Sequence, residues 1–350
     1  LELEPYSTKS FEHSIKLDAM EMPDDSSKLD GASMLSALSG LKLNRYPDPK
    51  FLILRKKILM TEKLDMSELD VIIGNGSDEL IQLLCLLMSN DGKGKLLIPA
   101  PTFSVYKILG QIYGLSVSEF ELDEDNFNLD ISKFTERILI DQPSLIFIAS
   151  PNNPTGNQLV NENIGDICRA ANGLVILDEA YYSFSQSSRL DLLKNFENLL
   201  VMRTMSKIGF AGIRLGMLFG RKDVVTLLNK LRLPFNVNTV SQHVGVEILD
   251  CQKIVKNKIQ LVVNERIFLM ERLIQLKGIK VYPSEANFIL VDFLNHNVEL
   301  VFSRLLNAGI LVKNVSNQHR LLKGCLRITV GTRDENRELL NILSKIIVKL

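Results

Sequence analysis

Hydrophobic and polar positions follow two rhythms from residue 69 onward: short apolar runs, and longer helical patterns between them. The apolar runs predict strands at 71–73, 95–98, 115–120, 144–149, 174–177, 199–203 and 214–219. Helical patterns such as the one over 79–88 fall between several of these runs. This alternation predicts an α/β fold whose mostly parallel sheet has helices on both faces. Ligands of such sheets bind at the carboxyl ends of the strands, so functional residues are expected there.

The pattern changes after about residue 222, where helices predominate and a second group of strands follows. Helices are predicted over 222–233, 240–270 and 298–308 and from 334 onward, with strands at 279–282, 287–292, 310–313 and 326–330. These elements predict a second, smaller α+β domain.

The length of 350 residues agrees with more than one domain, because a single hydrophobic core rarely serves so long a chain. Residues 1–30 are polar and irregular, which predicts an arm rather than a core element. We therefore expect an arm over 1–30 that joins the small domain and the active site, a large domain over 31–240 and a small domain over 241–350.

Charge and cysteine usage exclude several classes of function. Lys and Arg total 41, and so do Asp and Glu, so no net field favours nucleic acid or an anionic membrane. The longest apolar runs, such as 83–88, are too short to span a bilayer, and we expect no secretory signal because the first residues show no charged segment followed by an apolar one. The four cysteines lie far apart and follow no metal-ligand spacing. These observations predict a cytoplasmic protein without a metal site.

The stretch 199–216 carries the strongest candidate for chemistry, Lys207. Its first residues predict a buried strand, and Lys207 follows the end of that strand, just before Gly209 and Gly212. A partly desolvated lysine has a lowered pKa, which makes a free amine available for a Schiff base. Arg214 follows seven residues later and could hold an anion beside the amine. Considered alone, the stretch fits a solvated lysine in a glycine-rich loop equally well.

Two further strand ends carry unusual polar residues. Residues 74–79, GNGSDE, join a strand to a helix, so free N–H groups and the helix dipole form an anion site. The alternative is a plain turn capped by Ser77 or Asp78. Residues 150–156, SPNNPTG, hold two adjacent asparagines between prolines, which stiffen the loop and present an amide. The alternative there is a rigid turn.

Asp178 directly follows the strand at 174–177 and is expected to be buried. A buried carboxylate needs a cation, and a protonated pyridine nitrogen would serve; the alternative is a structural Asp–Arg pair. Together these strand ends supply an amine nucleophile, a carboxylate for a pyridinium, an amide and a phenol for a ring oxygen, and an anion site. Pyridoxal 5'-phosphate (PLP) requires those groups of a protein.

Motifs along nearly the whole chain strengthen this hypothesis. They are KLDAMEMP (16–23), NRYPDP (44–49), GNGSDEL (74–80), PTF (101–103), SPNNPTG (150–156), LDEAYYSF (177–184), RTMSKIGFAGIRLG (203–216), SEANFIL (284–290) and CLRITVGTRDEN (325–336). By these motifs the chain resembles the class I and II aminotransferases of PLP fold type I, and most closely the histidinol-phosphate aminotransferase family. The resemblance implies a large domain with a mostly parallel sheet sandwiched by helices, and a smaller α+β domain.

The resemblance also implies roles for single residues. Lys207 would form the Schiff base and move a proton, Asp178 would pair with the pyridinium, and Tyr181 would bind the ring oxygen. The other cofactor contacts would come from Ser77, Asp78, Phe103, Asn153, Ser206 and Arg214, and from Tyr46 across a homodimer with shared sites. Arg327 would clamp the substrate carboxylate, and the other substrate contacts would come from Asn153, Lys313 and Tyr6.

Some positions depart from the family's pattern. Met22 stands where an Asn or Cys is common, and Lys313 stands where an arginine often binds the substrate phosphate. A lysine supplies positive charge but not the paired N–H donors of a guanidinium, which Arg320 nearby could provide instead.

The expected reaction exchanges the amino group of L-histidinol phosphate with 2-oxoglutarate, in histidine biosynthesis. The alternatives are an aromatic amino acid aminotransferase, a threonine-phosphate decarboxylase-like enzyme, and a module that binds ligand without chemistry.

Overall fold

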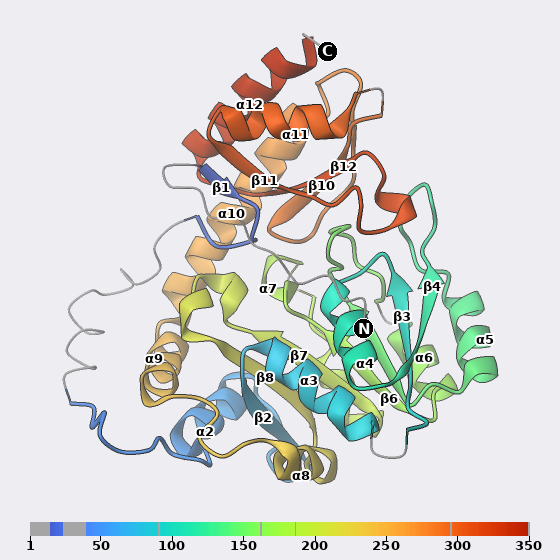
Figure 1. Ribbon diagram of the computed structural model, residues 1–350. Helices are drawn as coiled ribbons and strands as arrows, with labels where there is room; N and C mark the ends of the chain where they lie inside the picture. Colours follow the sequence, from blue (N-terminus) through green and yellow to red (C-terminus); the bar gives the residue numbers. More distant parts are fainter. Residues whose placement is uncertain are drawn as a thin grey trace.

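Two β-sheets, one above the other in Figure 1, organise the chain. The computed structural model describes residues 15–23, 40–89, 92–161, 163–185, 187–294 and 296–348. The larger sheet and its helices form the lower part of that view, and the smaller sheet with the C-terminal helix forms the upper part. None of the described helices is both long enough and apolar enough to cross a membrane.

Seven strands make the larger sheet. In chain order they are β2 (Leu69–Asn75), β3 (Lys95–Ala100), β4 (Ser116–Glu121), β5 (Leu145–Ala149), β6 (Leu174–Asp178), β7 (Leu199–Thr204) and β8 (Leu215–Arg221). Their order across the sheet is β2-β8-β7-β6-β5-β3-β4, and every strand runs in the same direction except β8. The predicted α/β fold with a mostly parallel sheet is confirmed.

The central strands bring their last residues to one edge of the sheet. Asp178, which ends β6, is in register with Ala149 of β5 and Met202 of β7. These strands are buried on both faces, which explains why their sequences are continuous apolar runs. Because β8 runs in the opposite direction, it begins at this same edge, with Gly216 paired to Thr204 of β7.

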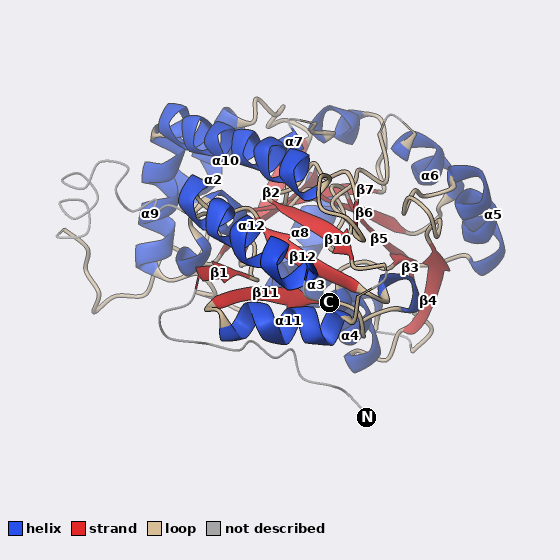
Figure 2. Ribbon diagram, turned by 90° about the horizontal axis from the view of Figure 1, so that it is seen from above, coloured by secondary structure: helices blue, strands red, loops and turns tan. Residues whose placement is uncertain are grey.

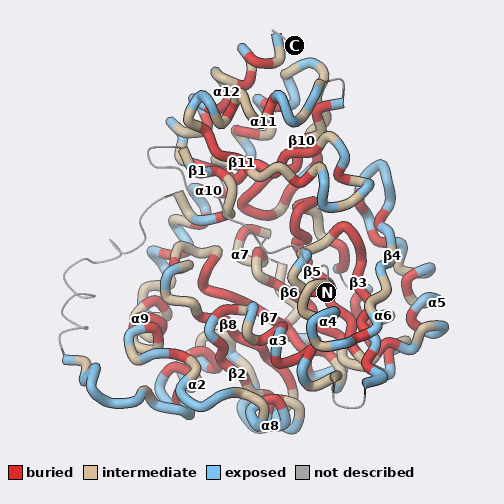
Figure 3. Tube along the Cα trace, viewed as in Figure 1, coloured by how far each residue is buried: buried red, intermediate tan, exposed pale blue. Residues whose placement is uncertain are grey.

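Helices cover both faces of the larger sheet. One face carries α3 (Ser77–Met88), α4 (Ser104–Ile112) and α8 (Lys222–Leu231), which pack on alternate strand residues such as Ile72, Phe147 and Leu200. The other face carries α2 (Leu52–Thr61), α5 (Ile131–Asp141), α6 (Ile164–Ala170) and α7 (Tyr182–Ser185). Figure 3 shows the strands as the buried centre between these layers. Short 3-10 helices lie at Leu190–Lys194, Ser206–Ile208, Ala211–Ile213 and Arg320–Leu322.

The smaller sheet joins strands from near both ends of the chain. They are β1 (Ile15–Leu17), β9 (Lys280–Val281), β10 (Phe288–Asp292), β11 (Ile310–Asn314) and β12 (Cys325–Thr329), in the order β1-β11-β12-β10-β9. Its helical cover, seen from above in Figure 2, comes from α10 (Gln252–Leu273), α11 (Val298–Asn307) and α12 (Arg333–Val348).

Two expectations about these elements are wrong. Residues 15–17, expected in an irregular arm, form β1, which pairs in parallel with β11 and buries Leu17 in the core. The single helix expected over 240–270 is two helices, α9 (Thr239–Asp250) and α10, because the backbone leaves the helical conformation at Cys251. α9 packs on α2, whereas α10 packs on both α7 and α12, so α10 connects the helices of the two sheets. The domain boundary near residue 240 stays a prediction.

Candidate active site

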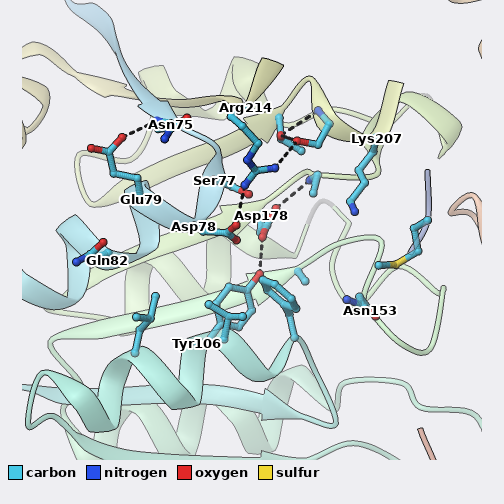
Figure 4. A pocket seen from close by; sticks show the side chains of 18 of the residues that line it. Asn75, Ser77, Asp78, Glu79, Gln82, Tyr106, Asn153, Asp178, Lys207 and Arg214 are labelled. Carbon is cyan, nitrogen blue, oxygen red and sulfur yellow. Dashed lines mark hydrogen bonds and ion pairs between the residues drawn. The ribbon is translucent and has the colours of Figure 1, made fainter. Parts of the chain in front are cut away.

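A cavity of about 770 Å³ opens at the carboxyl edge of the larger sheet, and Figure 4 looks into it. Arm residues Ala19 and Met20, which follow β1 of the smaller sheet, also line it. Nine residues singled out in the sequence line this cavity: Ser77, Asp78, Phe103, Asn153, Asp178, Tyr181, Ser206, Lys207 and Arg214. The strand ends that carry unusual polar residues therefore meet around one space.

Lys207 follows β7, and its partly buried side chain reaches into the cavity. Its Nζ donates a hydrogen bond to the carbonyl oxygen of Ala19 over 3.4 Å. Burial, and after it the positive charge of Arg327, lowers the pKa of Lys207 to about 8. A fully solvated lysine would show no such shift, so the structure favours the reactive amine over the solvated alternative.

Asp178 is buried at the end of β6 without a cationic partner among the described residues. Its Oδ2 accepts a hydrogen bond from the hydroxyl of Tyr106 over 2.5 Å, and its Oδ1 accepts one from the N–H of Ala180 over 2.9 Å. Burial raises the pKa of Asp178 to about 6, and these two bonds oppose the rise. The Asp–Arg pair considered as an alternative falls one residue later, where Glu179 contacts Arg203 over 2.9 Å.

The two asparagines of the 150–156 loop have different tasks. Asn152 is structural, because its side chain donates to the carbonyl of Pro101 over 2.9 Å and accepts from Thr102 over 2.7 Å. Asn153 lines the cavity, and its Oδ1 accepts a hydrogen bond from Nη1 of Arg327 over 2.6 Å. With its oxygen held in this way, Asn153 has its amide N–H groups left as donors.

The turn before α3 forms a close cradle of N–H groups. Gly76 has a φ of 85° and caps α3 through its backbone, so neither Ser77 nor Asp78 is the side-chain cap considered above. Gly216 approaches so closely that a Cβ there would lie 2.5 Å from the nitrogen of Ser77. Arg214 reaches this place from the loop before β8, with Nη2 3.0 Å from Oδ2 of Asp78. The positive end of α3 and a guanidinium thus converge on one anion site.

Two aromatic residues complete the cavity wall. Tyr181 donates from its hydroxyl to Sδ of Met20 over 2.9 Å, and its ring meets Phe288 edge-on at 5.1 Å between centroids. Phe103 lines the cavity next to Tyr106, whose ring it meets at 89°. The phenol of Tyr181 and the ring face of Phe103 suit hydrogen bonding and stacking with a flat ligand.

Three other predicted residues lie outside the lining of this cavity. Arg327 is buried on β12 and is the cross-strand neighbour of Lys313 on β11, so two cations share one face beside the arm. Burial, and after it the charge of Arg327, lowers the pKa of Lys313. Tyr46 is 82% exposed and stacks on Phe235 at 4.5 Å between centroids. Tyr6 lies outside the described residues.

Arg320 is engaged elsewhere, although the sequence allowed it to replace a substrate-binding arginine. Its guanidinium donates to both carboxylate oxygens of Glu121 and to Oε1 of Glu124 over 2.8 Å. These contacts bind the loop before β12 to the end of β4 in the larger sheet. A guanidinium whose N–H donors already bind carboxylates is a poor candidate for binding a phosphate.

The sequence did not single out Tyr106 or the backbone of the arm. Arm residues 18–20 present three successive carbonyl oxygens: Asp18 accepts from Arg327 over 2.6 Å, Ala19 from Lys207, and Met20 from Asn287 over 2.9 Å. The motif KLDAMEMP marked the segment, but nothing in it showed that its backbone faces the cavity.

These donors and acceptors fit PLP. The cavity offers an amine with a lowered pKa, a buried carboxylate whose described partners are neutral, and an arginine beside the N-terminus of a helix. Lys207 would hold the aldehyde carbon, Asp178 the ring nitrogen, and Arg214 with Ser77 and Ser206 the phosphate.

Comparisons with known proteins agree with this fit. The sequence profile of the family described as aminotransferase class I and II matches residues 12–343. Histidinol-phosphate aminotransferase 2 of Nitrosococcus oceani is 42% identical over 333 residues, 94% of this chain and 91% of the relative.

Two crystal structures of histidinol-phosphate aminotransferases are also similar. The enzyme from Clostridium acetobutylicum superposes with a TM-score of 0.88 at 25% identity, over 96% of this chain and all of that one. The enzyme from Sinorhizobium meliloti, solved in complex with PLP, shares the fold with a TM-score of 0.84 at 20% identity, over 96% and 91% of the two chains. The chain therefore belongs to the class I and II aminotransferases, a PLP-dependent family.

Proposed function

We propose that the chain transfers the amino group of L-histidinol phosphate to 2-oxoglutarate, giving imidazole acetol-phosphate and L-glutamate. This is the transamination step of histidine biosynthesis. The proposal rests mainly on the 42% identity, over 94% of this chain, to a histidinol-phosphate aminotransferase. The amine of Lys207 and the carboxylate of Asp178 in one cavity support the same reaction class. The guanidinium of Arg327, bonded to Asn153 of the cavity lining, supports it too.

The side chains divide the chemistry among them. When bound, PLP supplies an electron sink for the carbanion at the substrate's α-carbon. The amine of Lys207, with its pKa near 8, takes the proton from that carbon and returns it during the exchange. Ionised Asp178 keeps the ring nitrogen protonated, because a buried carboxylate stabilises a cation beside it. Arg327 binds the carboxylate of glutamate through two parallel hydrogen bonds.

Lys313 favours a phosphorylated substrate over a neutral aromatic one. It lies beside Arg327 on the same face of the smaller sheet, so an anion bound there meets two positive charges. An aromatic amino acid has no second anionic group that could meet the charge of Lys313, whereas a phosphate does. We therefore do not favour an aromatic aminotransferase. A decarboxylase would differ in whether CO₂ is released, which a direct assay resolves.

The proposal includes a homodimer with shared sites. Several large apolar side chains on and near α2 are exposed in the single chain: Tyr46, Leu52, Ile53, Met60 and Leu233. Leu233 and its neighbour Pro234 also line the cavity, so a second copy on this surface would border the site. A large exposed apolar patch is typical of such an interface. Sedimentation equilibrium should give twice the mass of the chain.

The expected cytoplasmic location belongs to the proposal as well. All four cysteines are free thiols, and three of them are buried. Thiols kept reduced are typical of that compartment.

The decisive experiment is a substrate panel with the PLP-loaded enzyme. Histidinol phosphate, phenylalanine, tyrosine and threonine phosphate are compared as donors, with 2-oxoglutarate as acceptor, and both glutamate and CO₂ are measured. We expect glutamate formation with histidinol phosphate to have the highest kcat/KM and no CO₂ release. A higher kcat/KM for phenylalanine or tyrosine would overturn the substrate assignment.

A second experiment tests the reactive amine. Borohydride treatment followed by digestion should place the pyridoxyl group on the peptide that contains Lys207, and Lys207→Ala should lose both the label and turnover. A label on any other lysine would overturn the catalytic assignment.

A further inference from the structure

We propose that Tyr106 is a positioning residue: its hydroxyl holds the carboxylate of Asp178 in the orientation that receives the ring nitrogen, and its ring supports Phe103. This inference rests on the proposed function, because it concerns the PLP contacts of the same cavity. Tyr106 comes from α4 on one side of the sheet edge and Asp178 from β6, so it joins two segments that are 72 residues apart.

The contact fixes Asp178 from two directions. The hydroxyl of Tyr106 donates to Oδ2 over 2.5 Å, while the N–H of Ala180 donates to Oδ1 over 2.9 Å. Figure 4 shows Tyr106 pointing up from below at Asp178, in the middle of the cavity. Each carboxylate oxygen thus accepts one hydrogen bond from the protein and has one further acceptor position left. With the hydroxyl removed, only the bond within the β6 loop would orient the carboxylate.

Tyr106 itself has little freedom to move. It is fully buried, and its ring lies parallel to that of Phe147, with 4.6 Å between centroids. It meets Phe103 edge-on at 5.5 Å, so one turn of α4 supplies both the residue expected on the face of the PLP ring and the residue behind its nitrogen partner. Thr102, next to this turn, is bonded to Asn152. The start of α4 is therefore tied to the loop that carries Asn153.

The charges around the site make the ionisation of Asp178 depend on the hydroxyl of Tyr106. Burial and the charge of Asp178 raise the pKa of Tyr106 well above its usual value, so it stays a donor at physiological pH. The negative charges of Asp78 and Glu179 oppose ionisation of Asp178, whereas the bonds from Tyr106 and Ala180 favour it. On the other sides of the cavity, Lys207 and Arg214 are the cationic groups among its lining residues. Without the hydroxyl of Tyr106, Asp178 would hold its proton to higher pH.

The test measures binding of PLP to the apoenzyme by equilibrium dialysis at pH 6 and pH 8. Tyr106→Phe keeps the ring packing and removes the hydroxyl. Tyr282→Phe is the matched control, because it removes the hydroxyl of another buried tyrosine that does not line the cavity. We expect Tyr106→Phe to raise the dissociation constant about tenfold at pH 6, the loss of one hydrogen bond to a charged group, and less at pH 8. Tyr282→Phe should equal the wild type at both pH values.

A double-mutant cycle separates positioning of the carboxylate from a merely structural role. In the Asp178→Asn background there is no carboxylate to ionise, so the effect of adding Tyr106→Phe on the dissociation constant should be the same at pH 6 and pH 8. Tyr106→Leu, which also removes the ring, should bind PLP more weakly than Tyr106→Phe.

The outcomes distinguish this inference from the proposed function. A wild-type chain that does not bind PLP would overturn both. A wild-type chain that binds PLP, with Tyr106→Phe equal to it at both pH values, would overturn only the role of Tyr106. An equal pH effect of Tyr106→Phe with and without Asp178 would overturn it too, because the hydroxyl would then act elsewhere.

Discussion

Arg327 donates a hydrogen bond from Nη1 to Oδ1 of Asn153 over 2.6 Å, which joins β12 of the smaller sheet to a loop of the larger one. The same guanidinium donates from Nη2 to the carbonyl of Asp18 over 2.6 Å. Arg327 therefore determines both which way the Asn153 amide faces and where the arm lies, in addition to any contact with substrate.

Replacing Arg327 by lysine should show this double role. Lysine keeps the charge but cannot bond Asn153, Asp18 and a carboxylate in fixed directions. We expect kcat/KM for glutamate to fall about 100-fold, the loss of roughly two charge-assisted hydrogen bonds. Arg333→Lys, at the start of α12 outside the cavity, is the control and should leave kcat/KM unchanged. A loss below threefold in Arg327→Lys would contradict the assignment.

Lys207 should lower the stability of the apoenzyme. Its pKa is about 8 in the folded chain and that of an ordinary lysine when unfolded, so between these values the unfolded chain binds more protons and stability rises with pH. Below pH 8 the full penalty applies. Lys207→Met should therefore raise the free energy of unfolding at pH 7 by up to about 3 kcal/mol, and by less at pH 9.5. Urea denaturation of the two apoproteins measures this; an equal gain at both pH values would contradict it.

Gly216→Ala should weaken anion binding through the backbone, without replacing any side chain of the anion site. A Cβ at Gly216 would lie 2.4 Å from the carbonyl carbon of Gly76 and 2.5 Å from the nitrogen of Ser77, both backbone atoms. The start of α3 must then shift, so we expect PLP to bind at least about tenfold more weakly, as if one charge-assisted bond were lost. Gly212→Ala is the control, because a Cβ there meets nothing within 4 Å. Equal affinities in equilibrium dialysis would count against the cradle.

The buried pair of Glu179 and Arg203 should contribute strongly to the stability of the fold. Arg203 also contacts Glu62 over 2.7 Å, and its guanidinium lies 3.6 Å from the ring centroid of Tyr182. Arg203→Met leaves Glu179 buried without its cation, a change that costs about 3–5 kcal/mol of unfolding free energy.

The pH dependence of that loss identifies its cause. Burial already raises the pKa of Glu179, and losing Arg203 raises it further, so the folded chain prefers the protonated acid. The destabilisation of Arg203→Met should therefore be smaller at pH 5 than at pH 8 in urea denaturation. Adding Glu179→Gln should recover part of it, and no recovery at pH 8 would assign the loss to packing instead.

Substitutions of Lys313 and of Arg320 should have different effects on the binding of a phosphorylated substrate. Lys313 lies beside Arg327, whereas Arg320 is held by Glu121 and Glu124. We expect Lys313→Ala to raise KM for histidinol phosphate about tenfold, the loss of one charged contact, while Lys313→Arg retains binding. Arg320→Ala should leave that KM nearly unchanged. The reverse order in steady-state kinetics would move the phosphate site to Arg320.

Several site residues could be located from the sequence because of how parallel sheets are built. Lys207, Asp178 and Asn153 each follow a continuous apolar strand by a few residues, and parallel strands end at one edge. The glycine-rich turn before α3 was recognisable for the same local reason. None of these inferences needed a contact between distant segments.

Features that depend on distant contacts could not be predicted in this way. Asn152 and Asn153 are identical neighbours, and only the bonds of Asn152 to Pro101 and Thr102 distinguish them. Tyr106 has the spacing of an ordinary buried helix residue, and its partner is 72 residues away. β1 has only three residues, too few for a periodic signal, and Cys251 separates two helices without a glycine or proline.

Arm residues 18–20 are held by Arg327, Lys207 and Asn287, two of which are expected to bind ligand themselves. Occupancy of the cavity and docking of the arm are consequently linked equilibria. Any molecule that draws the guanidinium or the amine away from these carbonyls loosens the arm. By thermodynamic reciprocity, a change that detaches the arm must raise the affinity of the cavity for that molecule by the same factor.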